Sequence, residues 1–394
     1  MSLKRLAILG GEPAFKEPLH VGRPNLGDRE VLFHYLNQVL ERKWLTNNGP
    51  LVRELESRIA KILGVKNVVA TVNGTLGLEI AIRALGLQGE VIVPSYTFAA
   101  TVHSLFWLGI KPVFVDVDPV TYNVDPKQVR RVITPETSGI MSVNVYGRPS
   151  DIEQLSEIAR DYNLKLLFDS AHAFHCSYRG KMIGNFGDAE VFSFHATKFF
   201  HTVEGGAVTT NDEQLAEKLR AMRDFGYVGL DQVEYVGTNA KMNEFSAAMG
   251  LTNLERLDEF VYVNHRNYRR YLKELDGLAG VTLMRYEETE KRNYGYIIIE
   301  VDPDVTGLTR DQLAKVLWAE NILARKYFYP PCHLMEPYRT LLPQARSRLR
   351  ETERISSRVL ALPTGISIKE EDIETISSII ELAIRNADGL KNIR

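Results

Sequence analysis

The sequence has little of several features that mark whole classes of protein. Its 394 residues include two cysteines, Cys176 and Cys332, too few for a disulfide framework or a four-thiolate zinc site. So small a number fits a reducing compartment, and we expect the cytoplasm. Lys and Arg number 48 against 50 Asp and Glu, so the net charge of −2 shows no basic excess that would favour nucleic acid or an anionic membrane. Apolar residues make up 44% of the sequence and charged residues 25%, a composition that excludes collagen-like and disordered proteins, and no repeat or low-complexity tract is found.

Long hydrophobic runs are scarce too. The stretch 91–110 is free of Asp, Glu, Lys and Arg and is long enough to span a bilayer, but it contains Pro94 and several Ser and Thr residues. The pattern therefore predicts a buried strand over Glu90–Val93, a turn, and a helix from about Ala99 to Gly109 instead of a membrane span. The apolar run near the N-terminus is too short for a signal-peptide core, so we expect no secretion.

What the sequence does have, over its first 250 residues, is an alternation of short apolar runs with helical patterns. Ile152–Tyr162, for example, has helical spacing between two such runs. Continuous apolar strands separated by helices indicate an α/β fold, in which a mostly parallel sheet is covered on both faces. Ligands of such sheets bind beyond the carboxyl ends of the strands. The predicted strands are 68–72, 91–93, 112–115, 139–145, 164–168, 190–194 and 206–209.

The pattern changes near residue 250. A long charged helix over Leu254–Leu275 leads to a strand over Tyr294–Val301, and Thr309 is placed to cap a further helix. The chain then ends in an amphipathic helix. We predict a large α/β domain over 1–250 and a smaller α+β domain over 251–394.

Lys198 is the central catalytic candidate. It lies in a short loop after the apolar strand 190–194. A lysine held among apolar neighbours is desolvated, so its pKa falls and its neutral amine can attack a carbonyl, as a Schiff-base lysine does. A lysine that extends its head group from the surface into water is the alternative that this residue alone leaves open.

Asp169 ends the predicted strand 164–168 on its carboxyl side. A carboxylate buried there requires a cation or a hydrogen-bond donor, and the protonated pyridine nitrogen of pyridoxal 5′-phosphate (PLP) is such a partner. Capping of the next turn is the alternative role for Asp169. His172 can donate a hydrogen bond to a cofactor oxygen, or it can pack in the core.

Two other strand ends also carry candidates. Gly74 and Thr75 follow the first predicted strand and open a helix, where a backbone without Cβ and a helix N-terminus favour a phosphate. An ordinary capped turn is the alternative. Phe98 follows the second predicted strand and can stack on a flat ring or pack in the core.

Two familiar cofactor patterns are missing. The Gly-Gly pair at 10–11 lacks the spacing of a dinucleotide fingerprint. The histidine pairs His172/His175 and His195/His201 have no companion carboxylate at an established spacing, so we predict no metal site.

The motifs together are more specific than any one of them. In order they are NGT at 73–75, PSYTF at 94–98, FDSAHA at 168–173, FSFHATK at 192–198, EGGA at 204–207 and GTNAKMNE at 237–244. This series resembles the DegT/StrS family of PLP-dependent sugar aminotransferases, from about Gly22 to the C-terminal helix. The resemblance implies the fold-type I aminotransferase architecture, with a three-layer large domain.

The resemblance also implies residue roles. Lys198 would bind PLP, Asp169 would pair with the pyridine nitrogen, and His172 would lie near the ring hydroxyl. The other matched cofactor positions are Phe98 on the ring, Gly74, Thr75 and Ser193 at the phosphate, and Asn239 at the phosphate of a neighbouring subunit. Such sharing of active sites implies a homodimer.

The implied reaction moves an amino group from glutamate to a nucleotide-diphosphate keto sugar in deoxysugar biosynthesis, with PLP and its amine form (PMP) alternating. The lysine at 198 favours amination, because a related branch that dehydrates sugars has histidine there. GTNAKM at 237–242 resembles the branch that aminates C4 of 4-keto-6-deoxyhexoses, so we expect dTDP-4-keto-6-deoxyglucose as substrate. Arg325, Tyr329 and His333 are the predicted substrate contacts, with an exposed basic strand end as the alternative.

Other functions stay open at this stage. They are a 3-keto-sugar aminotransferase, a PLP-dependent sugar dehydrase, lyase or aldolase, and a non-catalytic regulatory or binding protein on the same fold. A dehydrogenase is disfavoured because the dinucleotide fingerprint is missing.

Overall fold

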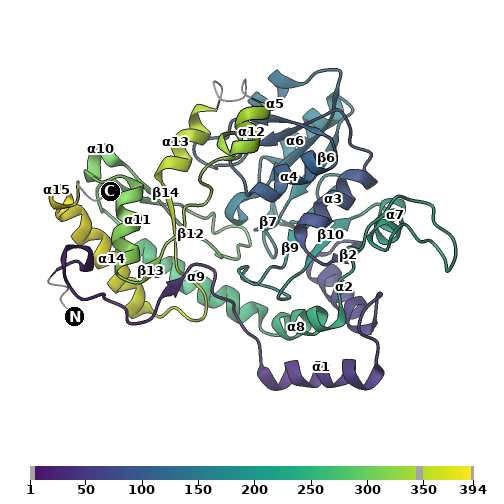
Figure 1. Ribbon diagram of the computed structural model, residues 1–394, viewed down its shortest axis with the longest axis horizontal. Helices are drawn as coiled ribbons and strands as arrows, with labels where there is room; N and C mark the ends of the chain where they lie inside the picture. Colours follow the sequence, from purple (N-terminus) through teal and green to yellow (C-terminus); the bar gives the residue numbers. More distant parts are fainter. Residues whose placement is uncertain (1–4, 343–348, 392–394) are drawn as a thin grey trace.

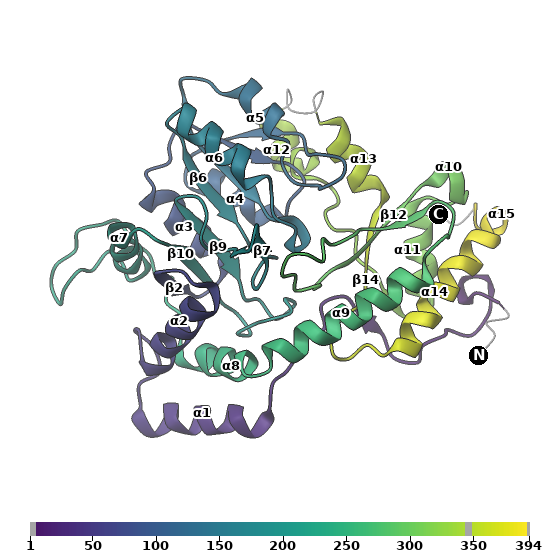
Figure 2. The ribbon, with the colours of Figure 1, turned by 180° about the vertical axis from the view of Figure 1, so that it is seen from behind.

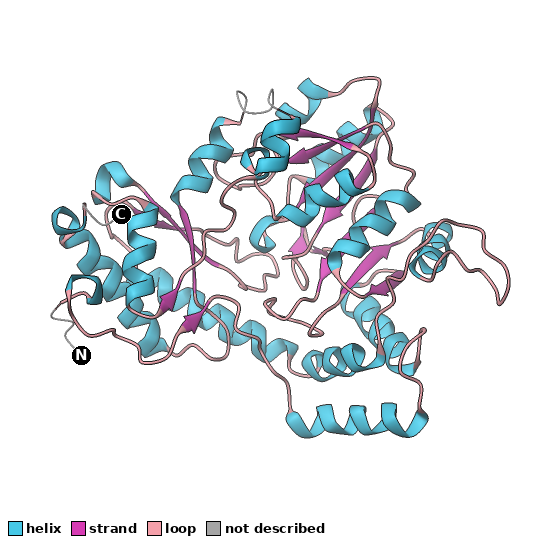
Figure 3. Ribbon diagram, viewed as in Figure 1, coloured by secondary structure: helices cyan, strands magenta, loops and turns pink. Residues whose placement is uncertain are grey.

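A seven-stranded sheet forms the centre of the larger part of the molecule (Figures 1 and 3). The structure is a computed structural model that describes residues 5–342 and 349–391. In this sheet the strand order is β2-β10-β9-β6-β5-β3-β4, and β10 alone runs antiparallel to its neighbours. The predicted α/β fold with a mostly parallel sheet is confirmed. The strands are β2 (Asn67–Thr71), β3 (Glu90–Pro94), β4 (Lys111–Val115), β5 (Thr137–Val143), β6 (Lys165–Asp169), β9 (Ala189–Ser193) and β10 (Gly206–Thr210).

Apolar cores lie on both faces of this sheet, because successive side chains of a strand point to opposite faces. On β6, Leu166 and Phe168 belong to one core and Leu167 to the other. Residues of α2, α5, α6 and α8 fill the first core, with α1 packed on α8, and residues of α3, α4 and α7 fill the second. The helices of this part are α1 (Arg29–Arg42), α2 (Pro50–Leu63), α3 (Gly74–Ala84), α4 (Ala99–Trp107), α5 (Pro126–Val132), α6 (Ile152–Asp161), α7 (Glu213–Arg223) and α8 (Glu244–Leu254).

The C-terminal part is built on a three-stranded antiparallel sheet of order β11-β12-β14. Its long helix α9 extends from the larger part and packs along α14, as Figure 2 shows. Thr309 caps α11 through a capping box, as predicted. The strands are β11 (Val281–Leu283), β12 (Ile297–Val301) and β14 (Val359–Leu362), and the main helices are α9 (Leu257–Glu274), α11 (Arg310–Ala319) and α14 (Glu370–Arg385).

Shorter elements join these parts. The short helices are α10 (Pro303–Thr306), α12 (Glu336–Leu341), α13 (Arg350–Arg358) and α15 (Ala387–Leu390), with 3₁₀ turns η1 (Ala7–Leu9), η2 (Val145–Gly147) and η3 (Cys332–Leu334). The short strands pair as β1 (Leu19–His20) with β13 (Ile322–Leu323) and β7 (Ser177–Tyr178) with β8 (Lys181–Met182).

The first residues of the chain pack with the C-terminal part. Leu6 belongs to its apolar core, and the Glu320 carboxylate accepts hydrogen bonds from the backbone N–H groups of Ala7 and Ala14. The predicted division into 1–250 and 251–394 stays a prediction. Through the contacts of Leu6 and Glu320, the N-terminal residues 5–14 pack against the second of these ranges.

Two predicted elements differ in extent from those observed. The helix expected over Leu254–Leu275 is α9, and a separate helix, α8, begins before it with Asn243 as its cap. The strand expected from Tyr294 begins at Ile297, because Tyr294 has a positive φ of 50° that no regular strand contains. The apolar run 91–110 forms β3 and α4, and no helix within 5–342 or 349–391 is long and apolar enough to cross a membrane.

Candidate active site

A cavity of about 370 Å³ lies beyond the carboxyl ends of β6 and β9, where an open parallel sheet offers its ligand site. Two groups of residues face each other across it. The first group, the sheet wall, consists of Gly74, Thr75, Asp169, His172, Ser193 and Lys198. The second group, the C-terminal wall, consists of Tyr296, Arg325, Tyr327 and Phe328.

Lys198 reaches the cavity from the loop that follows β9. Phe194 and Phe200 anchor this loop in the core, and the Lys198 backbone N–H donates to His195 O at 2.9 Å. The Lys198 Nζ donates a hydrogen bond to the Tyr296 hydroxyl at 3.1 Å. Burial lowers the pKa of Lys198 to about 8, although Tyr327 and Asp169 act in the opposite direction. A substantial fraction of the amine is therefore neutral, and able to act as a nucleophile, near pH 8.

Asp169 is the last residue of β6 and is 5% exposed. Its Oδ2 accepts from Thr101 Oγ1 at 2.7 Å, and its Oδ1 accepts from the Ala171 N–H at 3.1 Å. Thr97 Oγ1 lies 2.7 Å from Thr101 Oγ1, so the Asp169 carboxylate ends a chain of buried hydroxyls.

Among the described residues, Asp169 has hydrogen-bond donors but no ion-pair partner. Burial raises the pKa of this carboxyl, while the hydrogen bonds from Thr101 and Ala171 and the charge of Lys198 lower it. Within the described part of the chain, no lysine, arginine or histidine nitrogen lies within 4.0 Å of the carboxylate. The site thus offers a buried carboxylate to a cationic group of a ligand.

His172 packs against aromatic rings of the cavity. Its ring is 4.5 Å from that of Tyr296 and 5.8 Å from that of Phe328, with an interplanar angle of 10° to the latter. The Tyr146 N–H donates to His172 Nδ1 at 3.1 Å, so the neutral ring carries its proton on Nε2. Burial keeps the pKa of His172 well below its usual range. His172 is therefore a neutral donor in the sheet wall.

The N-terminus of α3 contributes Gly74 and Thr75 to the sheet wall. Asn73 caps the helix by accepting from the Leu76 N–H at 2.8 Å. The N–H groups of Gly74 and Thr75 belong to the first turn of α3, so the helix itself offers them no acceptor. A Cβ on Gly74 would lie 3.1 Å from the Ser193 Cβ, so glycine allows α3 to approach β9 closely. The first-turn N–H groups, the helix dipole and the hydroxyls of Thr75 and Ser193 together suit a phosphate.

Phe98 and Asn239 differ in their relation to the cavity. Phe98 lines it, with 61% of its surface exposed. Asn239 is exposed at the base of the loop 225–237 and does not line the cavity of this chain. A role for Asn239 in the site of a neighbouring subunit stays a prediction.

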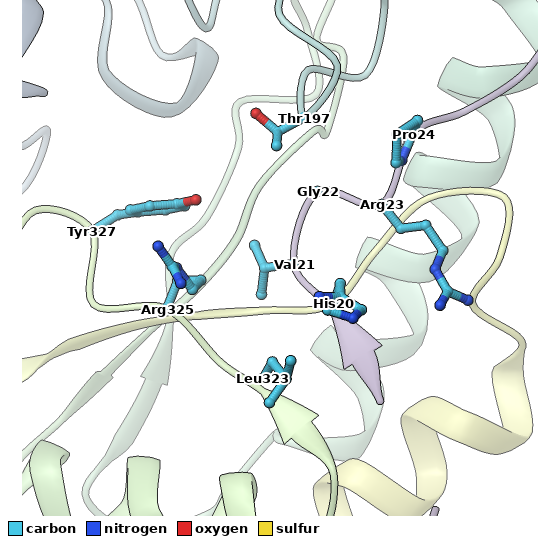
Figure 4. Close-up of a pocket in the computed structure, with 9 residues that line it drawn as sticks. All are labelled: His20, Val21, Gly22, Arg23, Pro24, Thr197, Leu323, Arg325 and Tyr327. Atoms are coloured by element: carbon cyan, nitrogen blue, oxygen red, sulfur yellow. The ribbon is translucent and has the colours of Figure 1, made fainter. Parts of the chain in front are cut away.

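The three predicted substrate contacts are spread over two places. Arg325 lines the cavity and also a neighbouring one of about 450 Å³, where it lies beside Tyr327 (Figure 4). Tyr329 is half exposed and stacks under the Arg310 guanidinium at 4.8 Å. His333 is buried, with its Nδ1 2.6 Å from Ser95 Oγ. Of the three, the structure brings Arg325 alone to the cavity.

Sequence reasoning missed Tyr296 and Thr101 as site residues. Tyr296 lies just before β12, far along the chain from the sheet wall, and no local pattern marks it. The sequence signal for Thr101 is its spacing of four residues from Thr97, about one helical turn, but this spacing is too common to mark a site.

The sequence and the fold are similar to those of known proteins. The model of the DegT/DnrJ/EryC1/StrS aminotransferase family matches residues 28–381. A dTDP-4-amino-4,6-dideoxy-D-glucose transaminase of Shigella dysenteriae is 38% identical over 93% of this chain and 99% of its own. A GDP-perosamine synthase of Caulobacter vibrioides is 35% identical over 92% of this chain and 97% of its own. The crystal structure of DesI in the presence of its TDP-sugar product is similar over 99% of this chain and 98% of its own, with 46% identity and a TM-score of 0.94.

Proposed function

The chain belongs to the DegT/DnrJ/EryC1/StrS aminotransferase family, and from this premise we propose that it transfers the amino group of glutamate to C4 of dTDP-4-keto-6-deoxyglucose. The product is the corresponding 4-amino-4,6-dideoxy sugar. The observation that carries the proposal is one cavity that brings together a half-buried lysine of lowered pKa, a buried carboxylate and a helix N-terminus. Among the described residues, no cation lies within 4.0 Å of this carboxylate. The names of the Shigella relative and of DesI support the thymidine nucleotide.

The residues of the sheet wall fit PLP. Asp169 offers its carboxylate to the pyridine nitrogen, and His172 offers its Nε2 proton to the ring hydroxyl. Gly74, Thr75 and Ser193 would hold the phosphate and Phe98 would contact the ring, because all four line the cavity. When bound, the cofactor supplies an electron sink for the carbon that loses its proton.

Lys198 performs two tasks in this proposal. Its neutral amine would hold the cofactor, and as a base it would take the proton from the α-carbon of glutamate. The lowered pKa of Lys198 suits both tasks, because an ammonium can neither attack a carbonyl nor accept a proton. The Asp169 carboxylate would favour the protonated ring nitrogen by its charge.

The nucleotide sugar extends along the C-terminal wall. Arg325 lines both cavities, so a substrate laid across them brings its diphosphate to the guanidinium, a group suited to bidentate phosphate contacts. Tyr329 and His333 lie outside the cavity lining, and we propose that they act by supporting the segment that carries Arg325.

The active form is a homodimer in this proposal. The loop 225–237 carries Leu230 and Val236, which are 97% and 73% exposed, and it extends away from the body of the chain beside α7 (Figure 2). Burial of these side chains by a second copy removes apolar surface from water. It also places Asn239, at the base of the same loop, toward the partner.

The test is a reaction of the purified chain with PLP, glutamate and dTDP-4-keto-6-deoxyglucose, with identification of the product by mass and NMR. The 3-keto isomer and a GDP-linked 4-keto-6-deoxyhexose are run in parallel, because the similarity to GDP-perosamine synthase makes the guanine nucleotide the second candidate. An amino group at C4 of the dTDP sugar supports the proposal. An amino group at C3, or a loss of oxygen without amination, contradicts it.

A further inference from the structure

Tyr296, a residue of the C-terminal wall, contacts Lys198 of the sheet wall. Its hydroxyl accepts the hydrogen bond from Lys198 Nζ at 3.1 Å, and Nζ lies 5.8 Å from the centre of its ring. Among the described residues this is the single side chain to which Nζ is hydrogen-bonded, and no carboxylate lies within 4.0 Å of Nζ. The position of the free amine therefore depends on Tyr296.

Tyr296 is held in place without help from Lys198. Asn293 donates to the carbonyls of His172 and Phe174 and accepts from the Gly295 N–H, which ties the loop before β12 to the sheet wall. The Tyr286 hydroxyl donates to Tyr296 O at 3.0 Å. The acceptor for the amine is thus preorganised.

The state of the Tyr296 hydroxyl is also fixed. Burial raises the pKa of Tyr296 far above its usual value, with a further contribution from Asp169, so the hydroxyl stays protonated wherever the enzyme works. It accepts from Lys198, and no acceptor for its own proton is found in 5–342 or 349–391. That proton is available to a ligand in the cavity.

We propose that Tyr296 is the positioning residue that holds the Lys198 amine at the reacting carbon whenever the amine is free, both before the cofactor is attached and while the lysine moves a proton. This inference rests on the proposed function of Lys198. Since Tyr296 belongs to the C-terminal part, it makes the geometry of proton transfer depend on both walls of the cavity. Other groups that face the lysine are Asp169, Tyr327 and the neutral His172.

The test compares Tyr296→Phe with Tyr294→Phe. Tyr296→Phe removes the hydroxyl and keeps the ring against His172, whereas Tyr294 is a buried ring of the same loop that does not line the cavity. Thermal unfolding of each variant first establishes a temperature at which both are folded. The first readout uses the cofactor-free chain: competitive acylation of Lys198 over a pH series, quantified by peptide mass spectrometry.

The expected result is a shift of the acylation midpoint in Tyr296→Phe alone. An acceptor favours the ammonium more than the neutral amine, so its loss lowers the midpoint below about 8 by roughly half a pH unit or more. The second readout is the single-turnover rate with glutamate, which falls by between about 10- and 100-fold because the amine is misplaced, while the apparent affinity for glutamate is kept. Tyr294→Phe retains the wild-type midpoint and rate.

Two outcomes separate this inference from the proposed function. An unchanged midpoint and an unchanged rate in Tyr296→Phe overturn the positioning role, even if Lys198→Ala is inactive. Covalent cofactor attachment or turnover in Lys198→Ala overturns the proposed function itself. A fall of the rate by the same factor in Tyr294→Phe and Tyr296→Phe, without a shift of the midpoint, shows a general structural effect and also overturns the positioning role.

Discussion

The sheet wall and the C-terminal wall of the cavity are built by different means. Asp169 and Ser193 end strands, and Gly74 opens the helix that follows one, so hydrogen bonding of the sheet itself sets their positions. Tyr296 and Tyr327 lie in loops held by distant partners; the Tyr96 hydroxyl, for example, donates to Tyr327 O at 2.8 Å. In the proposed function, the sheet wall carries the cofactor chemistry, and the C-terminal wall carries substrate contact and alignment.

The largest effect is expected from removal of the amine of the sheet wall. Lys198→Ala eliminates both the attachment of the cofactor and the proton carrier, so turnover falls by about 10⁴-fold or more. Product formation measured by mass spectrometry checks this, with Lys181→Ala as a control far from the cavity lining. A variant that retains the wild-type rate would falsify the assignment of Lys198.

The next effect is expected at Asp169. Asp169→Asn keeps the shape of the side chain but removes the negative charge that stabilises a protonated ring nitrogen. Turnover therefore falls by about 10²- to 10³-fold. The single-turnover rate with glutamate reports it directly. If Asp169→Asn is as active as the wild type, the sheet wall does not bind a cationic ring.

The pH dependence of cofactor capture follows from the lowered pKa of Lys198. The neutral amine fraction falls as pH drops below about 8, so capture of PLP by the cofactor-free chain slows about 50-fold between pH 8 and pH 6. Stopped-flow absorbance measures it, and a rate that is flat from pH 6 to 9 contradicts the expectation.

For the same reason, the unfolded chain binds more protons than the folded one between about pH 8 and 10.5, so the contribution of Lys198 to stability rises with pH across that window.

Arg325 tests the other wall. Arg325→Gln removes a charged contact to the diphosphate, so KM for the nucleotide sugar rises by about 10- to 100-fold while the single-turnover rate with glutamate changes much less. Arg385→Gln is the matched control, because Arg385 is exposed on α14 and lines neither cavity. Equal losses in both half-reactions would remove the distinction between the walls.

The smallest effect is expected behind Asp169. Thr101→Val removes the hydroxyl that donates to Oδ2, which lowers the single-turnover rate by about 3- to 10-fold, whereas Thr101→Ser keeps the donor and the rate. If the two variants are equally slow, the methyl group of Thr101 matters and the hydroxyl does not.

The same comparison explains what could be predicted from the sequence. Asp169, Gly74 and Lys198 each follow an apolar run that forms a buried strand, so a local pattern is enough to bring them to one edge of the sheet. No local pattern brings Tyr296 to Lys198, because that contact depends on Asn293 bonding to the loop after β6. His333 and Tyr329 share a basic and aromatic segment with Arg325, but Ser95 and Arg310 hold them away from the cavity.

The central claim is that Lys198 of the sheet wall attaches the cofactor. Loading of the wild-type chain with PLP, reduction with borohydride and peptide mapping by mass spectrometry identify the lysine that holds it. We expect a single pyridoxyl group, on Lys198, that is absent from Lys198→Ala. Modification of a different lysine at equal yield in the wild type and in Lys198→Ala contradicts it.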